Sequence, residues 1–253
     1  MSRTLAIRLV SLAVVLTAWE LYGRSVNPIL FTYPIAIVQA FLELGQSGEL
    51  VGYLSQSLQV LAIALLLSVG AGVPLGVLLA RFGALELATD LYINALYATP
   101  MVALVPLIVL WFGFGIPAKV IIVFLFMIFP VLINTQQGVK NVDRALLEVA
   151  RSFCSTERQL WGDVILPSAL PFIAAGVRLA IGRGLVGMVV AEFYTSISGL
   201  GYMIVRYANA FETAKLFVPI VVLMVMGVLL VQGARAVELR IAPWQRHGGA
   251  GER

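Results

Sequence analysis

This sequence of 253 residues contains a single cysteine and a single histidine, and their scarcity excludes several kinds of site. One cysteine cannot form an internal disulfide or a cysteine-cluster metal site. The lone histidine, His247, excludes a multi-histidine metal site, and its place in a polar tail suits a catalytic base poorly. We therefore expect the chain to hold no metal ion.

Sequence motifs of enzymes are also missing. No glycine is followed directly by lysine, so the chain has no Walker A loop to hold the phosphates of ATP. The metalloprotease pattern HExxH, a Ser-His pair and paired carboxylates within an apolar run are likewise missing. We expect that the chain is not an enzyme and binds no cofactor. If ATP drives its function, ATP and Mg²⁺ are bound by a separate ATPase.

Charged residues are scarce as well. They make up 12% of the chain, against about 25% in soluble domains. Hydrophobic residues make up 60%, and the mean hydropathy is +0.98. These values predict a polytopic membrane protein. The net charge of +4 does not indicate nucleic-acid binding, because basic residues of membrane proteins collect in cytoplasmic loops.

Long apolar runs dominate what is present, and each approaches or exceeds the ~20 residues that cross a bilayer. They predict an all-α fold, a transmembrane helix bundle forming a single domain over residues 1–253. Arg3 and Arg8 precede the first run, and no small-x-small cleavage site follows it, so we read it as a retained span. The predicted spans cover about 5–23, 55–80, 92–112, 118–137, 168–193 and 215–235. Pro100 and Pro106 interrupt the third.

A further short helix is predicted between the first two spans. Pro34 leads into it, since proline is well tolerated in the first turn of a helix. Its apolar residues recur at helical spacing and are Ile35, Val38, Phe41 and Leu42.

Six spans place both termini on one side of the membrane, and the basic residues indicate which side. The side with the termini carries eleven of them: Arg3, Arg8, Arg81, Lys140, Arg144, Arg151, Arg158, Arg235, Arg240, Arg246 and Arg253. The other side carries four: Arg24, Lys119, Arg206 and Lys215. The positive-inside rule makes the first side, with both termini, the cytoplasmic one.

A charged amphipathic segment at residues 141–165, here called the 141–165 loop, lies on that side. An apolar stripe at helical spacing consists of Val142, Leu146, Val149 and Phe153. Arg144 and Glu148 occupy the other side at i,i+4 spacing. Thr156 and Gln159 form a capping-box pattern, which predicts that a second short helix begins there. We expect two short helices at a sharp angle, one face on the bundle and the other toward a partner.

The loop resembles the EAA loop of ABC-importer permeases, which begins with Glu-Ala-Ala and ends with Leu-Pro. The residues that match its two ends are Glu148, Val149, Ala150, Leu166 and Pro167. Cys154 replaces the glycine of the motif, and cysteine tolerates a positive φ poorly, which leaves the turn angle open. The resemblance to the nitrate, taurine and sulfonate class of these permeases extends over 57–81, 106–113, 130–148 and 176–203.

The resemblance implies that an ATPase contacts this loop. We expect Glu148 to meet a basic residue of the ATPase. The other residues expected to couple to it are Ala150, Phe153, Cys154, Leu160, Trp161 and Pro167. The alternatives are a solvated loop without a partner, or apolar residues that pack on the bundle instead.

Charged residues within the fifth span are candidates for the translocation pathway. Arg183 is costly at the bilayer centre, by about 2.5–3.5 kcal/mol, and must face protein or water. It shares a stripe with Gly176, Ala180 and Gly187, so we expect it to point into the bundle, as an anion-favouring pathway residue or as a structural arginine. Arg178 is expected to be structural.

Two further positions are candidates for this pathway. Glu192 is expected to contact solute or to pair with a loop cation such as Arg206. Pro100 is a candidate because prolines in transporter helices often line a cavity. Residues 198–201 are expected to form a turn outside the fifth span, near the place where a solute-binding protein docks.

The resemblance implies the permease subunit of an ATP-driven importer for a small solute, such as a sulfonate, taurine or nitrate. It implies two ATPase subunits, a second copy of the permease, and a periplasmic or lipid-anchored solute-binding protein. It also implies a multi-pass location in the bacterial inner membrane, in contact with lipid. A stand-alone secondary transporter or channel, and an export permease, are the alternatives. The same class also includes permeases for pyrimidine precursors of thiamine, which are uncharged or nearly so.

Overall fold

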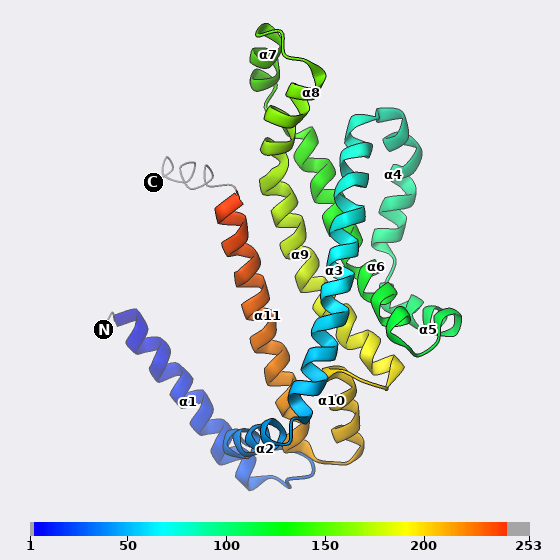
Figure 1. Ribbon diagram of the computed structural model, residues 1–253. Helices are drawn as coiled ribbons and strands as arrows, with labels where there is room; N and C mark the ends of the chain where they lie inside the picture. The colour runs from blue at the N-terminus through cyan, green and yellow to red at the C-terminus, as the bar shows by residue number, and fades with distance from the viewer. Residues whose placement is uncertain (1–2, 242–253) are drawn as a thin grey trace.

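The computed structural model describes residues 3–241, and every regular element in that range is a helix (Figure 1). The elements are α1 (Arg3–Ser25), α2 (Pro34–Gln46), α3 (Glu49–Arg81), α4 (Gly83–Ala98), α5 (Met101–Phe112), α6 (Ile116–Lys140), α7 (Arg144–Ser152), α8 (Glu157–Gln159), a π-helical stretch (Leu160–Ile165), α9 (Leu166–Thr195), α10 (Leu200–Asn209) and α11 (Thr213–Ile241). The predicted all-α fold is confirmed. Arg246, His247 and Arg253 lie outside the described residues.

Five helical segments are long and apolar enough to cross a membrane. They are α1, α3, α6, α11 and the continuous stretch Glu157–Thr195 that ends in α9. The third predicted span differs from the expectation, since α4 and α5 meet at an angle of 93°. Thr99, which precedes a proline, is extended with ψ 131, and this conformation ends α4. Pro100 therefore makes the break, whereas Pro106 lies inside α5 without ending it.

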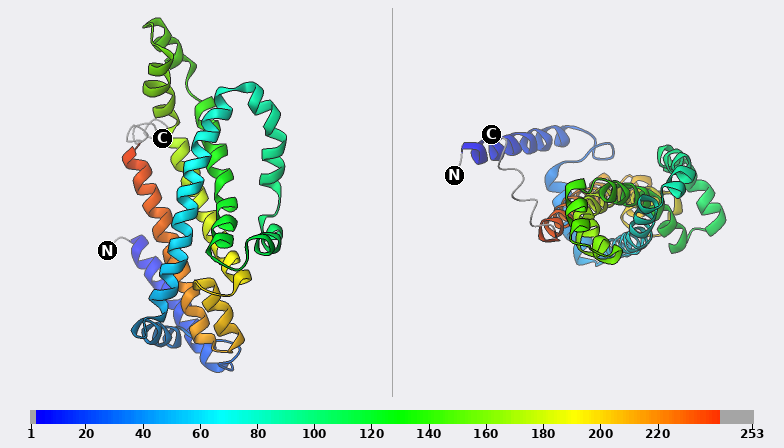
Figure 2. Two further views of the ribbon diagram at one scale, coloured as in Figure 1. Left: turned by 45° about the vertical axis from the view of Figure 1, so that its right-hand side comes forward. Right: turned by 90° about the horizontal axis from the view of Figure 1, so that it is seen from above.

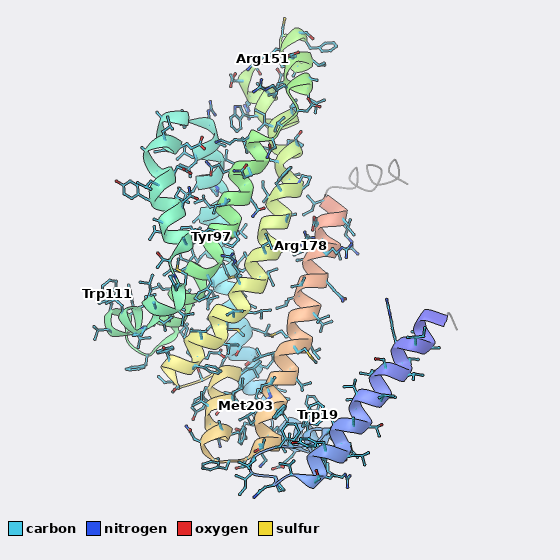
Figure 3. All side chains as sticks on the ribbon, turned by 180° about the vertical axis from the view of Figure 1, so that it is seen from behind. Trp19, Tyr97, Trp111, Arg151, Arg178 and Met203 are labelled. Atoms are coloured by element: carbon cyan, nitrogen blue, oxygen red, sulfur yellow. The ribbon has the colours of Figure 1, made fainter. Side chains whose placement is uncertain are left out.

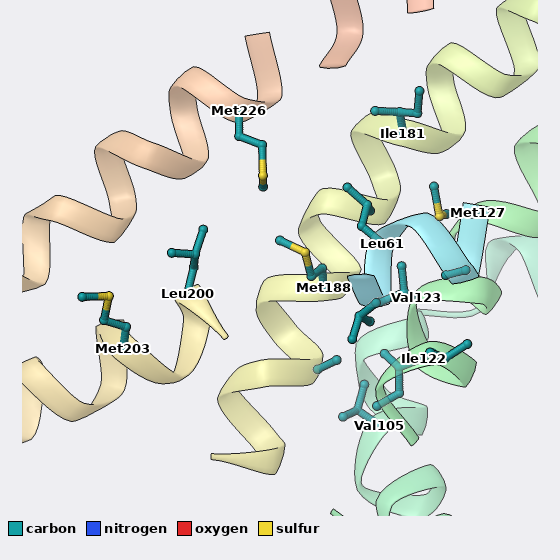
Figure 4. Close-up of a cluster of buried hydrophobic side chains, with 14 of the residues drawn as sticks. Leu61, Val105, Ile122, Val123, Met127, Ile181, Met188, Leu200, Met203 and Met226 are labelled. Atoms are coloured by element: carbon teal, nitrogen blue, oxygen red, sulfur yellow. The ribbon is translucent and has the colours of Figure 1, made fainter. Parts of the chain in front are cut away.

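Helix α6 is the centre of the bundle and packs most extensively against α9 and α3. Glycines allow these backbones to approach closely. A Cβ on Gly176 would lie 2.9 Å from the carbonyl oxygen of Pro130, and one on Gly184 would lie 2.6 Å from the sulfur of Met127. The core between these helices is shown in Figure 4 and includes Leu61, Ile122, Val123, Met127 and Met188.

The bundle has two distinct ends (Figures 1 and 2). Helices α7 and α8 project beyond one end, here called the loop end, and α2 and α10 cover the opposite end, here called the α10 end. The C-terminal ends of α3, α6 and α11 point toward the loop end. Helix α1 stands apart from the other spans and meets them at the α10 end, where Trp19 Nε1 donates a hydrogen bond to Thr32 O at 2.9 Å.

The predicted short helix corresponds to α2, but its packed face is different from the expected one. The residues that α2 buries are Ile37, Ala40 and Leu44. The expected apolar residues, Ile35, Val38, Phe41 and Leu42, are exposed on the protomer. The helix is apolar on more than one side, and the contacts with α3 and α11 decide which side is covered. Hydrophobic spacing alone does not distinguish the two faces.

Candidate functional site

The 141–165 loop is built by local capping interactions. The Asp143 carboxylate accepts a hydrogen bond from Ala145 N at 2.8 Å and begins α7. Thr156 N donates to Gln159 Oε1 at 2.9 Å, and Gln159 N donates to Thr156 Oγ1 at 3.4 Å. This is the predicted capping box, so the predicted start of the second helix is confirmed.

The second helix continues without a break into α9. Pro167 in the first turn of α9 and Pro171 inside it both lack an N–H, and a proline ring crowds the carbonyl one turn earlier. The chain accommodates this by widening to a π-helix over Leu160–Ile165, where Leu166 N donates to Trp161 O, five residues back. One helical rod therefore joins the loop to the α10 end of α9.

Cys154 adopts φ 55, in the left-handed region that favours glycine. Its N–H donates to Arg151 O at 2.9 Å, and Ser155 N donates to Ala150 O at 3.2 Å. These two bonds form a Schellman motif, which satisfies carbonyls at the end of α7. The turn that the motif glycine would allow is thus kept although cysteine occupies the position.

Replacing this residue in the variant Cys154→Gly is expected to raise stability slightly, by about 1 kcal/mol, because glycine relieves the left-handed strain. The measurement is thermal unfolding of the purified membrane complex. Ser152→Gly, inside α7, is the matched control and is expected to lower stability by about 1 kcal/mol. A lower unfolding temperature for Cys154→Gly, or loss of assembly, would contradict this account of the turn.

One residue of the apolar stripe of the loop is buried, and the other three are exposed. Val142 is buried with Leu160 and Ile165 in a small core of the loop itself. The stripe residues on α7 and at its C-cap are open, with exposed fractions of 50% for Leu146, 54% for Val149 and 80% for Phe153. The surface that remains for a partner is therefore the outer face of α7.

Several expected coupling residues face their own chain. Leu160 is 6% exposed, and the guanidinium of Arg81 lies over the Trp161 ring at 5.0 Å, so both hold the loop on the bundle. Glu148 is exposed and makes no ion pair within residues 3–241, where its expected i,i+4 pairing with Arg144 is not formed. Ala150 and Pro167 are half-buried.

At the α10 end, Glu192 is a buried structural carboxylate rather than an open pathway group. It is 1% exposed and accepts hydrogen bonds from Ser57 Oγ at 2.6 Å and from Gly201 N at 2.7 Å. A Cβ on Gly199 would overlap the Glu192 carboxylate, which explains the glycine at that position, where φ is 99. Lys119 anchors the same turn by donating to Ser198 O at 2.6 Å. Glu192 thus joins α3 and α9 to the start of α10.

The expected pairing of Glu192 with Arg206 is wrong. Arg206 instead pairs with Glu49 at the start of α3, at 2.5 Å. Tyr207 donates a hydrogen bond to the same carboxylate at 3.1 Å. Burial, together with this hydrogen bond, raises the pKa of Tyr207 to about 12. The phenol therefore stays protonated at neutral pH and remains a donor that ties α10 to α3.

Arg183 lies at the edge of the small-residue stripe, not within it. Gly176, Gly184 and Gly187 face α6, whereas Arg183 is exposed on the protomer and its guanidinium lies 4.6 Å from the centre of the Tyr97 ring. The expectation that Arg183 points into the bundle is therefore met only in part, because the side chain is exposed on the protomer while its guanidinium lies against α4 of its own chain. Arg178, by contrast, is structural, because it pairs with Glu238 of α11 at 2.6 Å (Figure 3).

A cavity of about 240 Å³ lies beside Arg183. Its wall includes Tyr97, Thr99, Met101, Phe126, Phe129 and Arg183. Pro100 stands between two of these residues, so the structure brings the expected positions 100 and 183 to one site and leaves Glu192 elsewhere. Sequence reasoning missed Tyr97, which lies near the end of α4 (Figure 3). The sequence feature that could have identified Tyr97 is an aromatic residue just before the proline at position 100.

The chain is similar to known membrane transport proteins. Residues 72–243 match the family described as "Binding-protein-dependent transport system inner membrane component". The chain is 38% identical over 235 residues to the putative aliphatic sulfonates transport permease protein SsuC of Bacillus subtilis, covering 92% of this chain and 85% of that one. It is 30% identical over 255 residues to the taurine transport system permease protein TauC of Escherichia coli, covering 98% and 92%.

Solved structures show the same fold. The inward-facing MetNI methionine ABC transporter matches with a TM-score of 0.66 at 17% identity, over 76% of this chain and 95% of that chain. At this identity the likeness concerns the arrangement of helices.

Proposed function

We infer the function of this chain from one premise: it belongs to the family of binding-protein-dependent transport system inner membrane components. The expected ABC-importer permease class is confirmed. The chain is a multi-pass inner-membrane transport subunit and not a catalytic enzyme. Membership in this class implies a partner ATPase and a solute-binding protein.

For the solute, we propose aliphatic sulfonates. The permease SsuC, named for these solutes, is 38% identical, and TauC, named for the aminosulfonate taurine, is 30% identical. The observation that carries the proposal within this chain is Arg183, a cation in the middle of a long apolar helix with no carboxylate partner in residues 3–241. Such a charge is costly unless it faces water, protein or an anion.

We propose that the transporter contains two copies of this permease and two ATPase subunits, which bind ATP and Mg²⁺. In this arrangement the exposed face of α9 with Arg183 lines the pathway and is covered by the second copy. Closure of the ATPase pair on ATP moves both 141–165 loops. Because each loop continues as one rod into α9, its displacement tilts the span as a rigid unit.

The loop end is proposed to be cytoplasmic, with both termini on that side. The support is the excess of basic residues assigned to it, eleven against four. Arg81, Lys140 and Arg151 lie at the loop end in the structure, whereas Arg24 and Arg206 lie at the α10 end. The α10 end would then face the solute-binding protein.

The test is purification of the tagged chain from its native cells, followed by reconstitution. An ABC ATPase should co-purify, and its ATPase activity should rise several-fold with binding protein loaded with ethanesulfonate. A channel would carry the solute without ATP and bring down no ATPase, and an export permease would bind no solute-binding protein. Stimulation by an uncharged pyrimidine instead of a sulfonate would overturn the proposed solute.

A further inference from the structure

The cavity beside Arg183 is created by the break in the third span. The Thr99 hydroxyl donates to Ala95 O at 2.8 Å and completes the last turn of α4. Helix α5 then departs at 93°, starting at Met101, and the space left at the corner is the cavity of about 240 Å³. Arg183 of α9 closes one side of it. Residues far apart in the sequence thus line a single hollow within the membrane-spanning part of the chain.

The guanidinium of Arg183 has donors that its own chain leaves unused. Among residues 3–241 it forms neither an ion pair nor a hydrogen bond, and its defined contact is the Tyr97 ring at 4.6 Å. A cation held over an aromatic face keeps the N–H groups at its edge free, and these form a fork that matches planar or tripodal oxyanions. A solute anion in the cavity would satisfy them.

The remaining wall is mostly apolar and suits the carbon part of a small solute. Phe126, Phe129 and Val186 line it, and the rings of Tyr97 and Phe129 contact each other in a tilted arrangement with centres 6.2 Å apart. The described lining contains no carboxylate to pair with the ammonium of an aminosulfonate, and the positive charge of Arg183 would repel it. The cavity is also below the ~300–1,000 Å³ of pockets for drug-sized ligands, which favours a solute of few heavy atoms.

We propose that this cavity is an alkanesulfonate-binding site within the permease itself, with Arg183 holding the sulfonate oxygens and Tyr97 orienting the guanidinium. The proposal rests on the sulfonate function proposed above and adds to it. The permease, and not only the binding protein, selects the solute, and it favours ethanesulfonate over taurine. The first turn of α5, whose Met101 lines the cavity, adds the favourable dipole of a helix N-terminus at the same corner.

The experiment is equilibrium binding of radiolabelled ethanesulfonate to the complete, ATP-free permease–ATPase complex without the binding protein. Arg183→Gln is expected to weaken binding at least tenfold, as a lost hydrogen bond to a charged group predicts. Taurine is expected to bind more weakly than ethanesulfonate. Arg235→Gln is the matched control, because Arg235 is also an exposed arginine of a spanning helix but lies outside the cavity. The Arg235→Gln complex should bind ethanesulfonate with the affinity of the unmodified complex.

Two milder variants keep the test decisive if Arg183→Gln fails to assemble. Arg183→Lys keeps the charge but loses the planar fork, and Tyr97→Leu removes the ring; each is expected to weaken binding several-fold. Unchanged affinity in all variants that assemble would overturn the site. Absence of binding by the unmodified complex, with sulfonate-stimulated ATPase intact, would overturn the site and leave the proposed function standing. Absence of both would overturn the proposed function as well.

Discussion

The variant Glu148→Lys is expected to lose coupled uptake, by roughly tenfold or more, while it still inserts and assembles in the membrane. Glu148 is exposed on α7, on the side of the helix opposite the apolar stripe, and it has no ion-pair partner within the described chain. A lysine there would repel the basic ATPase residue that we expect to meet it. The measurement is binding-protein-stimulated ATPase activity and solute uptake in proteoliposomes.

The control for this variant is the same charge reversal at Glu157, an exposed carboxylate of the same loop that lies on α8 instead of α7. Glu157→Lys should retain coupling, because Glu157 lies on α8 and the proposed contact with the ATPase lies on α7. If Glu148→Lys kept normal stimulated ATPase activity and normal uptake, the outer face of α7 would not be the coupling surface.

The variant Glu192→Leu is expected to destabilise the α10 end strongly, by about 3–5 kcal/mol, as is typical when one member of a buried charged network is removed. It leaves the Ser57 hydroxyl and the Gly201 N–H without their acceptor, and Lys119 without a nearby negative charge. The measurement is the unfolding temperature of the purified complex. Glu192→Gln, which keeps an oxygen acceptor, should recover part of the loss.

Glu43→Gln is the control, because Glu43 is also a paired carboxylate at the α10 end but is exposed to solvent. Its side chain is 63% exposed and pairs with Lys215, so its loss should cost less than about 1 kcal/mol. Should Glu192→Leu unfold at the normal temperature yet abolish transport, Glu192 would belong to the solute pathway after all.

Features with local causes could be predicted before the structure was known. The capping box at Thr156 needs only a hydroxyl and an amide three residues apart, and it forms where the sequence placed it. The membrane-spanning runs depend on hydropathy summed along the chain. Cys154 shows the limit of such local rules, because its side chain predicts strain while the Schellman hydrogen bonds donated by Cys154 N and Ser155 N accompany φ 55.

Features that depend on which segments meet could not be predicted. Glu192 has Ser57 as its partner across 135 residues of sequence, and the expected loop cation, Arg206, pairs with Glu49 instead. Arg183 shares its helical spacing with a buried stripe, yet Gly184 takes the central place and Arg183 falls at the edge. Packing of α3 and α10 against α9 sets the partners of Glu192 and Arg206, and close packing of α6 against α9 sets the place of Arg183.

The sequence by itself determined that this chain is a helical membrane protein, and it located the two short helices of the 141–165 loop. Apolar content, caps and prolines act within a few residues, so they are readable along the chain. The tertiary structure alone decided which charges are satisfied inside the protomer and which remain open. A buried charge is stabilised by whatever donors the fold brings to it, and only folded helices bring residues so distant in sequence together.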